Sequence, residues 1–215
     1  MLQLSSASLP VGGFTYSRGL EAAVELGWVT DAGSARAWIG GLLHECAGRL
    51  DAPLVLRAHD AFSRGDVAAV ARWAAFDQAC RETDELRRES SAMGRALGRW
   101  LVELGLAAPS ELAGEVRESY VVTFGLAAHR LGLDADAAVS AYLWSWLESG
   151  VTAAVKLVPL GQTDGQRITL ALGAELEEVA GVARALADDD LGALVPGFAI
   201  ASAQHETLHT RLFRS

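Results

Sequence analysis

Apolar residues recur along most of this 215-residue chain at the spacing i, i+3, i+4, i+7, which is the repeat of one face of an α-helix. Three successive stripes show it clearly, over residues 39–46, 54–62 and 67–74. No convincing run of alternating apolar and polar residues, the pattern of a half-buried strand, occurs anywhere. The pattern therefore predicts an all-α protein.

Residues that start or stop helices separate these stripes. Asp51 and Pro53 are typical of a helix start, whereas Gly65 followed by Asp66 is typical of a helix stop and the N-cap of the next helix. The same punctuation recurs at residues 109–110 and 132–134. We therefore expect one helix to end and another to begin near each of these positions.

The segment 83–104 has two different sides. One side is apolar and includes Met93 and Trp100, and the other side is charged. Asp84 and Arg88 have the i, i+4 order that stabilises an exposed helix by roughly a few tenths of a kcal/mol. We interpret the charged side as a face in contact with solvent.

A long segment, 134–157, is apolar around most of its circumference, and its polar residues fall on a narrow stripe. Such a helix must be covered on several sides, so we expect it at the centre of a helical bundle that forms one domain over residues 1–215. Trp144 and Trp146 would point about 200° apart, because successive helical residues turn by about 100°. Part of the aromatic surface, Tyr142 and Trp146, is predicted to face a second copy of the chain.

Two further helices are expected after this segment. Thr163 and Gln166 have the T-x-x-Q form of a capping box, which would open a helix through Leu172. After the turn at residues 196–197, a last helix would run through residues 200–212.

Composition and charge narrow the functional classes. The length fits one domain or at most two, and 51% hydrophobic with 21% charged residues is an ordinary globular balance. The net charge of −9 argues against a nucleic-acid partner. No window is apolar enough for a membrane span, and residues 1–10 lack the basic start of a secretory signal, so we expect a cytoplasmic protein. Cys46 and Cys80 lack zinc-site spacing and are predicted to be buried free thiols.

The sequence contains no complete motif for catalysis or cofactor binding. The only lysine, Lys156, is followed by Leu157 and is therefore not the lysine of a P-loop. His205, Glu206 and His209 match the H-E-x-x-H of zinc peptidases, but none of the six residues that follow could supply a third metal ligand. A zinc-dependent hydrolase with an upstream third ligand stays open as an alternative. We otherwise expect no catalytic residue, no metal site and no cofactor.

Three segments carry more distinctive motifs. They are SLPVGGFTYSRGLE at residues 8–21, AAVKLVPLGQTDGQR at residues 153–167 and HETLHTRLFRS at residues 205–215. In this order, and spread over nearly the whole chain, they resemble the family of the urease accessory protein UreF.

The resemblance implies an all-helical homodimer that assists the delivery of nickel to apo-urease and is not itself an enzyme. It implies two partners besides apo-urease: an accessory protein called UreD or UreH, and the nickel-carrying GTPase UreG. The UreF subunit bridges these two and is thought to couple GTP hydrolysis to metal transfer. A generic helical protein-interaction module, unrelated to nickel, is the alternative.

The resemblance also suggests where the partners bind. Apolar side chains at Leu212 and Phe213, so near the last residue, either fold back on the core or dock on a partner, and the resemblance favours the partner. We therefore expect a C-terminal helix over residues 204–214 that docks on the UreD/UreH-like protein. The residues expected at that interface are His205, Glu206, Leu208, Arg211, Leu212, Phe213 and Arg214.

A second surface is expected to meet the GTPase. It would consist of Tyr16 and Glu21, at the start of the chain, with Lys156 and Gln162, at the end of the central helix and in the turn after it. Two other interpretations remain: Tyr16 packs in the core, and Lys156 only covers its own helix.

Overall fold

The segment predicted at the centre of the bundle is helix α7, Ala135–Leu157, in the computed structural model, which describes residues 1–215. Asp134 caps its start by accepting a hydrogen bond of 2.7 Å from the backbone N–H of Ala137. The chain contains no strand. The other α-helices are α1 (Leu20–Glu25), α2 (Ala32–Leu42), α3 (Ala52–Arg64), α4 (Val67–Cys80), α5 (Asp84–Glu103), α6 (Tyr120–Arg130), α8 (Gln162–Gly173), α9 (Leu176–Ala185) and α10 (Pro196–His205).

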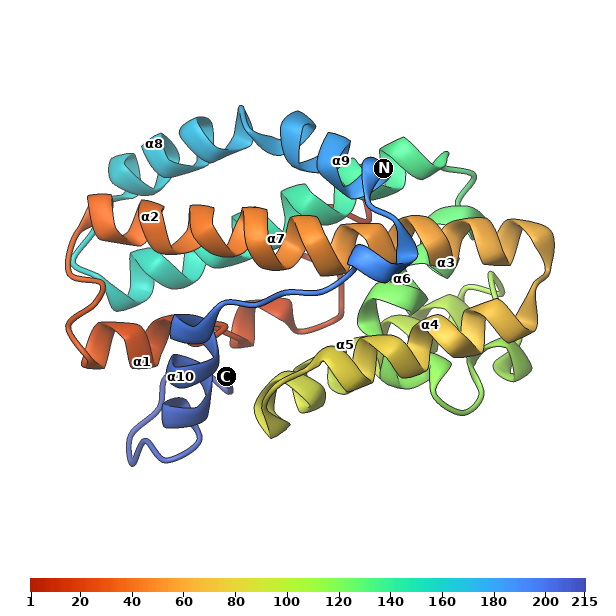
Figure 1. Cartoon of the computed structure of the whole chain (residues 1–215), viewed down its shortest axis with the longest axis horizontal. Coiled ribbons are helices and arrows are strands. Elements are labelled where there is room, and N and C mark those ends of the chain that lie inside the picture. The colour runs from red at the N-terminus through yellow and green to blue at the C-terminus, as the bar shows by residue number, and fades with distance from the viewer.

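Helix α7 is covered on several sides, as its sequence predicted. It packs most extensively against α3 and α8 and also contacts α1, α2, α6 and α9, while α6 lies between α3 and α5 (Figure 1). The prediction of an all-α bundle with a largely buried central helix is therefore confirmed. None of the helices combines the length and apolar character that a membrane span requires.

Helix α3 begins at Ala52 with Pro53 in its first turn, as predicted, but the helix is not interrupted there and the Asp51 side chain does not cap it. Helices α2 and α3 are joined by a π-helical stretch, η2 (Leu43–Asp51), into the long orange helix of Figure 1. Pro53 has no N–H to donate to the carbonyl of Arg49, four residues earlier. That carbonyl instead accepts a hydrogen bond of 3.2 Å from the N–H of Gly192, in the loop that crosses this helix. A contact distant in sequence thus replaces the bond that the proline removes.

Most other helix boundaries follow the sequence signals. Gly65 ends α3 with a φ of 67°, and the Asp66 side chain caps α4 by accepting a bond from the N–H of Ala69. The capping box predicted at Thr163 is wrong, however. Helix α8 starts at Gln162, so its N-cap residue is Gly161, two residues before Thr163, and Gly161 has no side chain to cap the helix.

The charged side of α5 is only partly exposed. Asp84 and Arg88 form the expected ion pair in solvent, at 2.5 Å. Glu85 and Glu89 are buried, which contradicts the interpretation of this side as a purely solvated face. Both carboxylates form hydrogen bonds with residues near the C-terminus.

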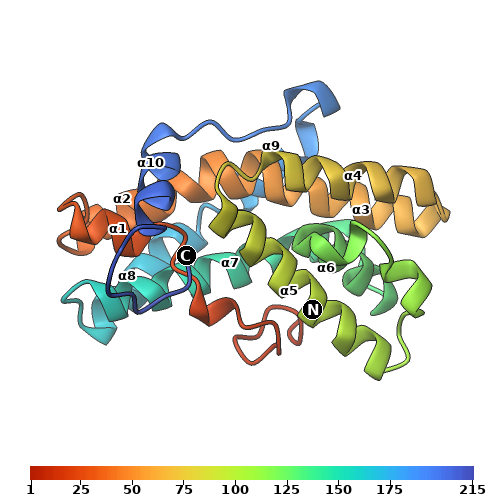
Figure 2. The same cartoon turned by 90° about the horizontal axis from the view of Figure 1, so that it is seen from below.

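The last predicted helix is shorter than expected. Helix α10 ends at His205, and residues 206–215 form turns and an extended tail that returns to α1 (Figures 1 and 2). The prediction of a helix over residues 204–214 is therefore wrong.

Two short helical turns complete the part of the chain next to α5. They are η3 (Pro109–Leu112) and η4 (Val116–Glu118), and a third, η1 (Gly13–Thr15), lies in the N-terminal segment. A fourth, η5 (Asp188–Asp190), precedes the crossing loop.

Candidate functional site

The C-terminal tail, residues 206–215, packs against the N-terminal segment. The backbone N–H of Arg214 donates to the carbonyl of Thr15 at 2.8 Å, and both the N–H and the hydroxyl of Ser17 donate to the carbonyl of Ser215 at 2.5 Å. The Phe213 side chain is buried, whereas that of Leu212 is 65% exposed. The apolar end of the chain is thus divided between the protein's own core and its surface.

Glu21, on α1, holds this tail in place. One oxygen of its carboxylate accepts a hydrogen bond from the N–H of Leu212 at 2.6 Å, and the other accepts one from the N–H of Phe213 at 2.9 Å. The second oxygen also lies 3.0 Å from Nε2 of His205. Glu21 is itself buried, so it meets the tail and not the solvent.

Glu85, on α5, holds the tail from the other side. One of its oxygens lies 2.7 Å from Nδ1 of His205, and the other accepts a bond of 2.6 Å from the guanidinium of Arg211. Both ring nitrogens of His205 are therefore engaged by carboxylates. His209 lies beyond the end of α10, so the helical H-E-x-x-H arrangement of a zinc peptidase does not form. No group of three or more His, Cys, Asp or Glu side chains in the chain is arranged so that it could hold a metal ion.

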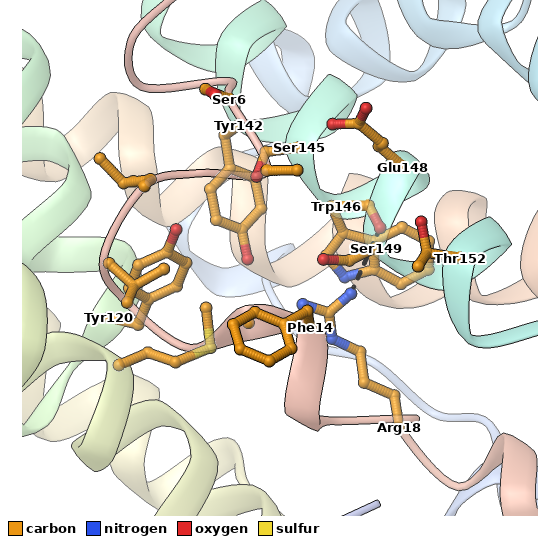
Figure 3. Close-up of a pocket in the computed structure, with 15 residues that line it drawn as sticks. Ser6, Phe14, Arg18, Tyr120, Tyr142, Ser145, Trp146, Glu148, Ser149 and Thr152 are labelled. Atoms are coloured by element: carbon orange, nitrogen blue, oxygen red, sulfur yellow. Dashed lines mark hydrogen bonds between the residues drawn. The ribbon is translucent and has the colours of Figure 1, made fainter. Parts of the chain in front are cut away.

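Arg18 connects the tail to the centre of the bundle. It is the only non-glycine residue with a positive φ, 51°, a backbone conformation that L-residues rarely adopt. Its guanidinium lies over the ring of Trp146, 4.9 Å from the centroid, and donates to the Trp146 carbonyl at 3.4 Å (Figure 3). It also donates to Glu89 at 3.1 Å, and Glu89 accepts a second bond of 2.8 Å from the hydroxyl of Ser215.

Two small cavities flank Arg18. Their volumes are about 60 and about 50 Å³, against roughly 300–1,000 Å³ for a typical small-molecule site. Figure 3 shows the first of them, between the N-terminal segment and α7, with Phe14, Tyr120 and Tyr142 around it. Desolvation by burial raises the pKa of both tyrosines, so they remain neutral phenols. These cavities have room for waters but not for an organic substrate.

The predicted dimer residues, Tyr142 and Trp146, are both buried within the chain. The hydroxyl of Tyr142 donates to Asp51 at 2.8 Å, and Asp51 also accepts a bond of 2.8 Å from Arg81. This buried network is the reason why Asp51 does not cap a helix. Neither aromatic side chain offers surface to a second copy, so their assignment to a dimer interface does not fit the structure. Trp144, on another side of α7, is 40% exposed.

The residues predicted to face the GTPase divide into two pairs. Lys156 and Gln162 are exposed and line one hollow of about 200 Å³ between α7 and α8. Tyr16 and Glu21 are buried beneath the tail, which corrects their expected outward placement. The two pairs remain neighbours, because the ammonium of Lys156 lies 5.7 Å from the ring centroid of Phe213.

The three distinctive segments therefore meet at one end of the molecule. Within the tail, His205 and Phe213 are buried, Leu208 is half-buried, and the other four predicted partner residues are exposed: Glu206, Arg211, Leu212 and Arg214. Burial of His205 and Phe213 fixes the path of the tail, and the exposed side chains give it an outer face.

Sequence reasoning missed four residues of this site: Arg18, Glu85, Glu89 and Ser215. One signal was available for Glu89, because it lies three residues after Leu86 and four before Met93, on the apolar stripe of α5. A carboxylate on an apolar stripe must find a buried partner. Arg18 showed no comparable signal.

Comparison with known proteins gives a consistent result. The family model described as UreF matches residues 29–173. The chain is 42% identical to a protein of Alkalilimnicola ehrlichii named urease accessory protein UreF, over 99% of this chain and 93% of that protein. It is 44% identical to the protein of the same name from Chromohalobacter salexigens, over 100% of this chain and 93% of the other. With that of an Azoarcus species it shares 46% identity, over 100% and 94%.

Proposed function

Because the chain belongs to the UreF family of urease accessory proteins, we propose that it is a non-enzymatic adaptor and chaperone in nickel insertion into apo-urease. In this role it bridges a UreD/UreH-like protein and a UreG-like GTPase in the cytoplasm and modulates GTP hydrolysis by the latter. Nickel is the cargo of the assembly.

The observation that carries this proposal is the meeting of three distant segments at one end of the bundle. Residues 8–21 and 205–215 share a buried polar cluster, and residues 153–167 contact it through Lys156, whose ammonium lies over the ring of Phe213. The cavities inside this end are too small for an organic substrate. A rigid end with varied exposed groups suits recognition of other proteins better than chemistry on a small molecule.

The outer face of the tail is the surface we assign to the UreD/UreH-like partner. Leu212 is an exposed apolar side chain, with Arg211 and Arg214 beside it in sequence, and arginine is enriched at protein interfaces. Leu212→Asp should abolish co-purification with this partner and leave the buried Phe213 in place. Retention of the partner by this variant would contradict the assignment.

The surface around Lys156 and Gln162 is the one we assign to the GTPase. In a co-expression pull-down with both accessory proteins, Lys156→Ala should lose the GTPase, keep the UreD/UreH-like protein and lower urease activation. Arg64→Ala, which also removes an exposed positive charge but lies at the end of α3, is the matched control. Normal activation by Lys156→Ala would refute the assignment. If neither protein co-purified with the unmodified chain, the alternative of an unrelated helical interaction module would replace the whole proposal.

Homodimerisation through the exposed face of α7 and α8 completes the proposal. Trp144 is 40% exposed, Leu170 is 76% exposed, and Gly173 lies beside the Trp144 ring, one turn of α8 from Leu170. Exposed large apolar side chains grouped in this way are typical of subunit contacts. Light scattering after size exclusion should show a dimer for the unmodified chain and a monomer for Trp144→Glu, and a dimeric variant would exclude this face.

A further inference from the structure

A second surface feature lies near the other end of α5. It is an open hollow of about 420 Å³, several times larger than either buried cavity. Its rim carries three arginines, and its apolar lining comes from one residue of α5 and from the segment after it. These residues are Arg95, Arg99, Arg117, Val102, Pro109 and Leu112.

The scaffold that carries the arginines is rigid. A Cβ atom at Gly94 would lie 2.7 Å from the carbonyl oxygen of Arg117, so the backbone before α6 packs directly on α5. A Cβ atom at Gly98 would lie 3.3 Å from the side chain of Leu112, which seats the η3 turn against the same helix. Figure 2 shows the segment of η3 and η4 running back beside α5. The backbone positions that carry the arginines are therefore fixed relative to one another, which lowers the cost of binding a ligand.

The three arginines differ in their partners. Arg95 and Arg117 both pair with Glu118, at 2.6 and 3.2 Å, which orients their side chains. Arg99 is exposed and forms no ion pair and no side-chain hydrogen bond. It is one of three arginines that form no ion pair, with Arg87 and Arg214, in a chain with 27 acidic and 18 basic residues.

We propose that this hollow is a docking site for an acidic, extended segment of a partner protein. Arginine presents a fork of donors that matches a carboxylate, and clusters of arginine recognise acidic motifs. The lining holds three arginines and one acidic residue, Glu103, and Glu118 pairs with two of the arginines, so Arg99 carries the local excess of positive charge in a chain with a net charge of −9. This local excess favours an acidic ligand. The apolar lining suits intervening aliphatic side chains. The net charge of −9 disfavours nucleic acid, because its phosphate backbone is repelled by a negatively charged protein.

This site is separate from the end that carries the three distinctive segments. Arg99 lies 14 residues after Glu85 on α5, which is about 20 Å along the helix axis. The proposed partner of the hollow can therefore bind while the tail is occupied. Failure of this inference would leave the proposed adaptor function unchanged.

The test uses the full chain and a fluorescein-labelled octapeptide of alternating glutamate and leucine, with binding followed by fluorescence anisotropy at low salt. We expect saturable binding that weakens as salt is added. Arg99→Glu should weaken binding by about tenfold or more, because it replaces an attraction by a repulsion in the hollow. Arg88→Glu is the matched control: it makes the same charge change on the same helix, at a side chain that is 77% exposed and outside the hollow. It should change the affinity by less than about twofold.

Three results would overturn the inference. The first is the absence of saturable binding by the unmodified chain. The second is equal weakening by Arg88→Glu and Arg99→Glu, which would mean that only net charge matters. The third is tighter binding of a fluorescein-labelled oligothymidylate of the same charge than of the peptide, which would identify a nucleic-acid surface instead.

Discussion

Replacing Glu21 by glutamine should release the C-terminal tail without unfolding the bundle. The change keeps the size of the side chain but removes its charge and turns one of its two oxygens into an amide that donates hydrogen bonds. Three groups point at the present carboxylate: the N–H groups of Leu212 and Phe213 and the imidazole of His205. In the variant, at least one of them would face a donor instead of an acceptor.

The size of the effect follows from these contacts. A hydrogen bond to a charged group contributes about 1.5–3 kcal/mol, and a neutral one about 0.5–1.5 kcal/mol, so each of the three bonds loses about 1 kcal/mol. The free energy needed to open the tail should therefore fall by about 3 kcal/mol, which raises the equilibrium constant for opening by about a hundredfold. Phe213 is the only residue that the tail adds to the buried hydrophobic core, so the tail can open while the rest of the core stays packed.

Hydrogen exchange followed by mass spectrometry measures this opening directly. Peptides covering residues 206–215 should exchange about a hundredfold faster in Glu21→Gln, and peptides from α6 and α7 should be unchanged. Glu25→Gln is the matched control, because Glu25 lies on the same helix, is exposed and holds no part of the tail. Unchanged exchange of the tail in Glu21→Gln would refute the role given to this carboxylate, and so would equal acceleration in both variants.

Two further predictions concern packing and thiol reactivity. Gly125→Ala should lower the free energy of unfolding in urea by about 1–3 kcal/mol, because its Cβ would lie 2.8 Å from Ala58 and force α3 and α6 apart. Gly181→Ala, with no atom within 4 Å, should raise it by about 0.5–1 kcal/mol, and a loss of stability in both variants would contradict this close contact. Burial raises the pKa of the Cys46 thiol to about 12, so at pH 8 its reactive thiolate is scarce. In Cys80→Ala, Ellman's reagent should react slowly with the native chain and rapidly after unfolding, and rapid reaction of the native chain would show that Cys46 is accessible.

The helices were predictable because their signals are local. The end of α3 at Gly65 and the capped starts of α4 and α7 at Asp66 and Asp134 depend only on residues close in sequence. The burial of α7 was equally readable, because a helix that is apolar around its circumference can satisfy its side chains only at the centre of a bundle.

The errors arose where a partner distant in sequence replaced the local signal. The sequence predicts that Asp51 is an N-cap, but its carboxylate instead accepts hydrogen bonds from Arg81 and Tyr142, which lie 30 and 91 residues away. Leu208 and Leu212 have helical spacing, yet α10 ends at His205, and Glu21 holds the tail that follows. In both places a buried carboxylate binds donors that are distant in sequence. The spacing of apolar and polar residues does not predict which donors these will be.

The shared use of Glu21 bears on how variants of this protein should be interpreted. The carboxylate of Glu21 holds the backbone of Phe213, and the Phe213 ring lies under the ammonium of Lys156. Loss of a partner in a Glu21 variant would therefore not mean that Glu21 touches that partner. Lys156→Ala separates the two cases, since it removes an exposed group and leaves every hydrogen bond of Glu21 in place. If a variant loses the GTPase while hydrogen exchange of its tail stays normal, the substituted residue contacts the GTPase. If it loses the GTPase and its tail exchanges faster, the substituted residue acts by holding the tail. Measuring hydrogen exchange of the tail and partner binding on the same variants therefore distinguishes residues that contact a partner from residues that only hold the tail in place.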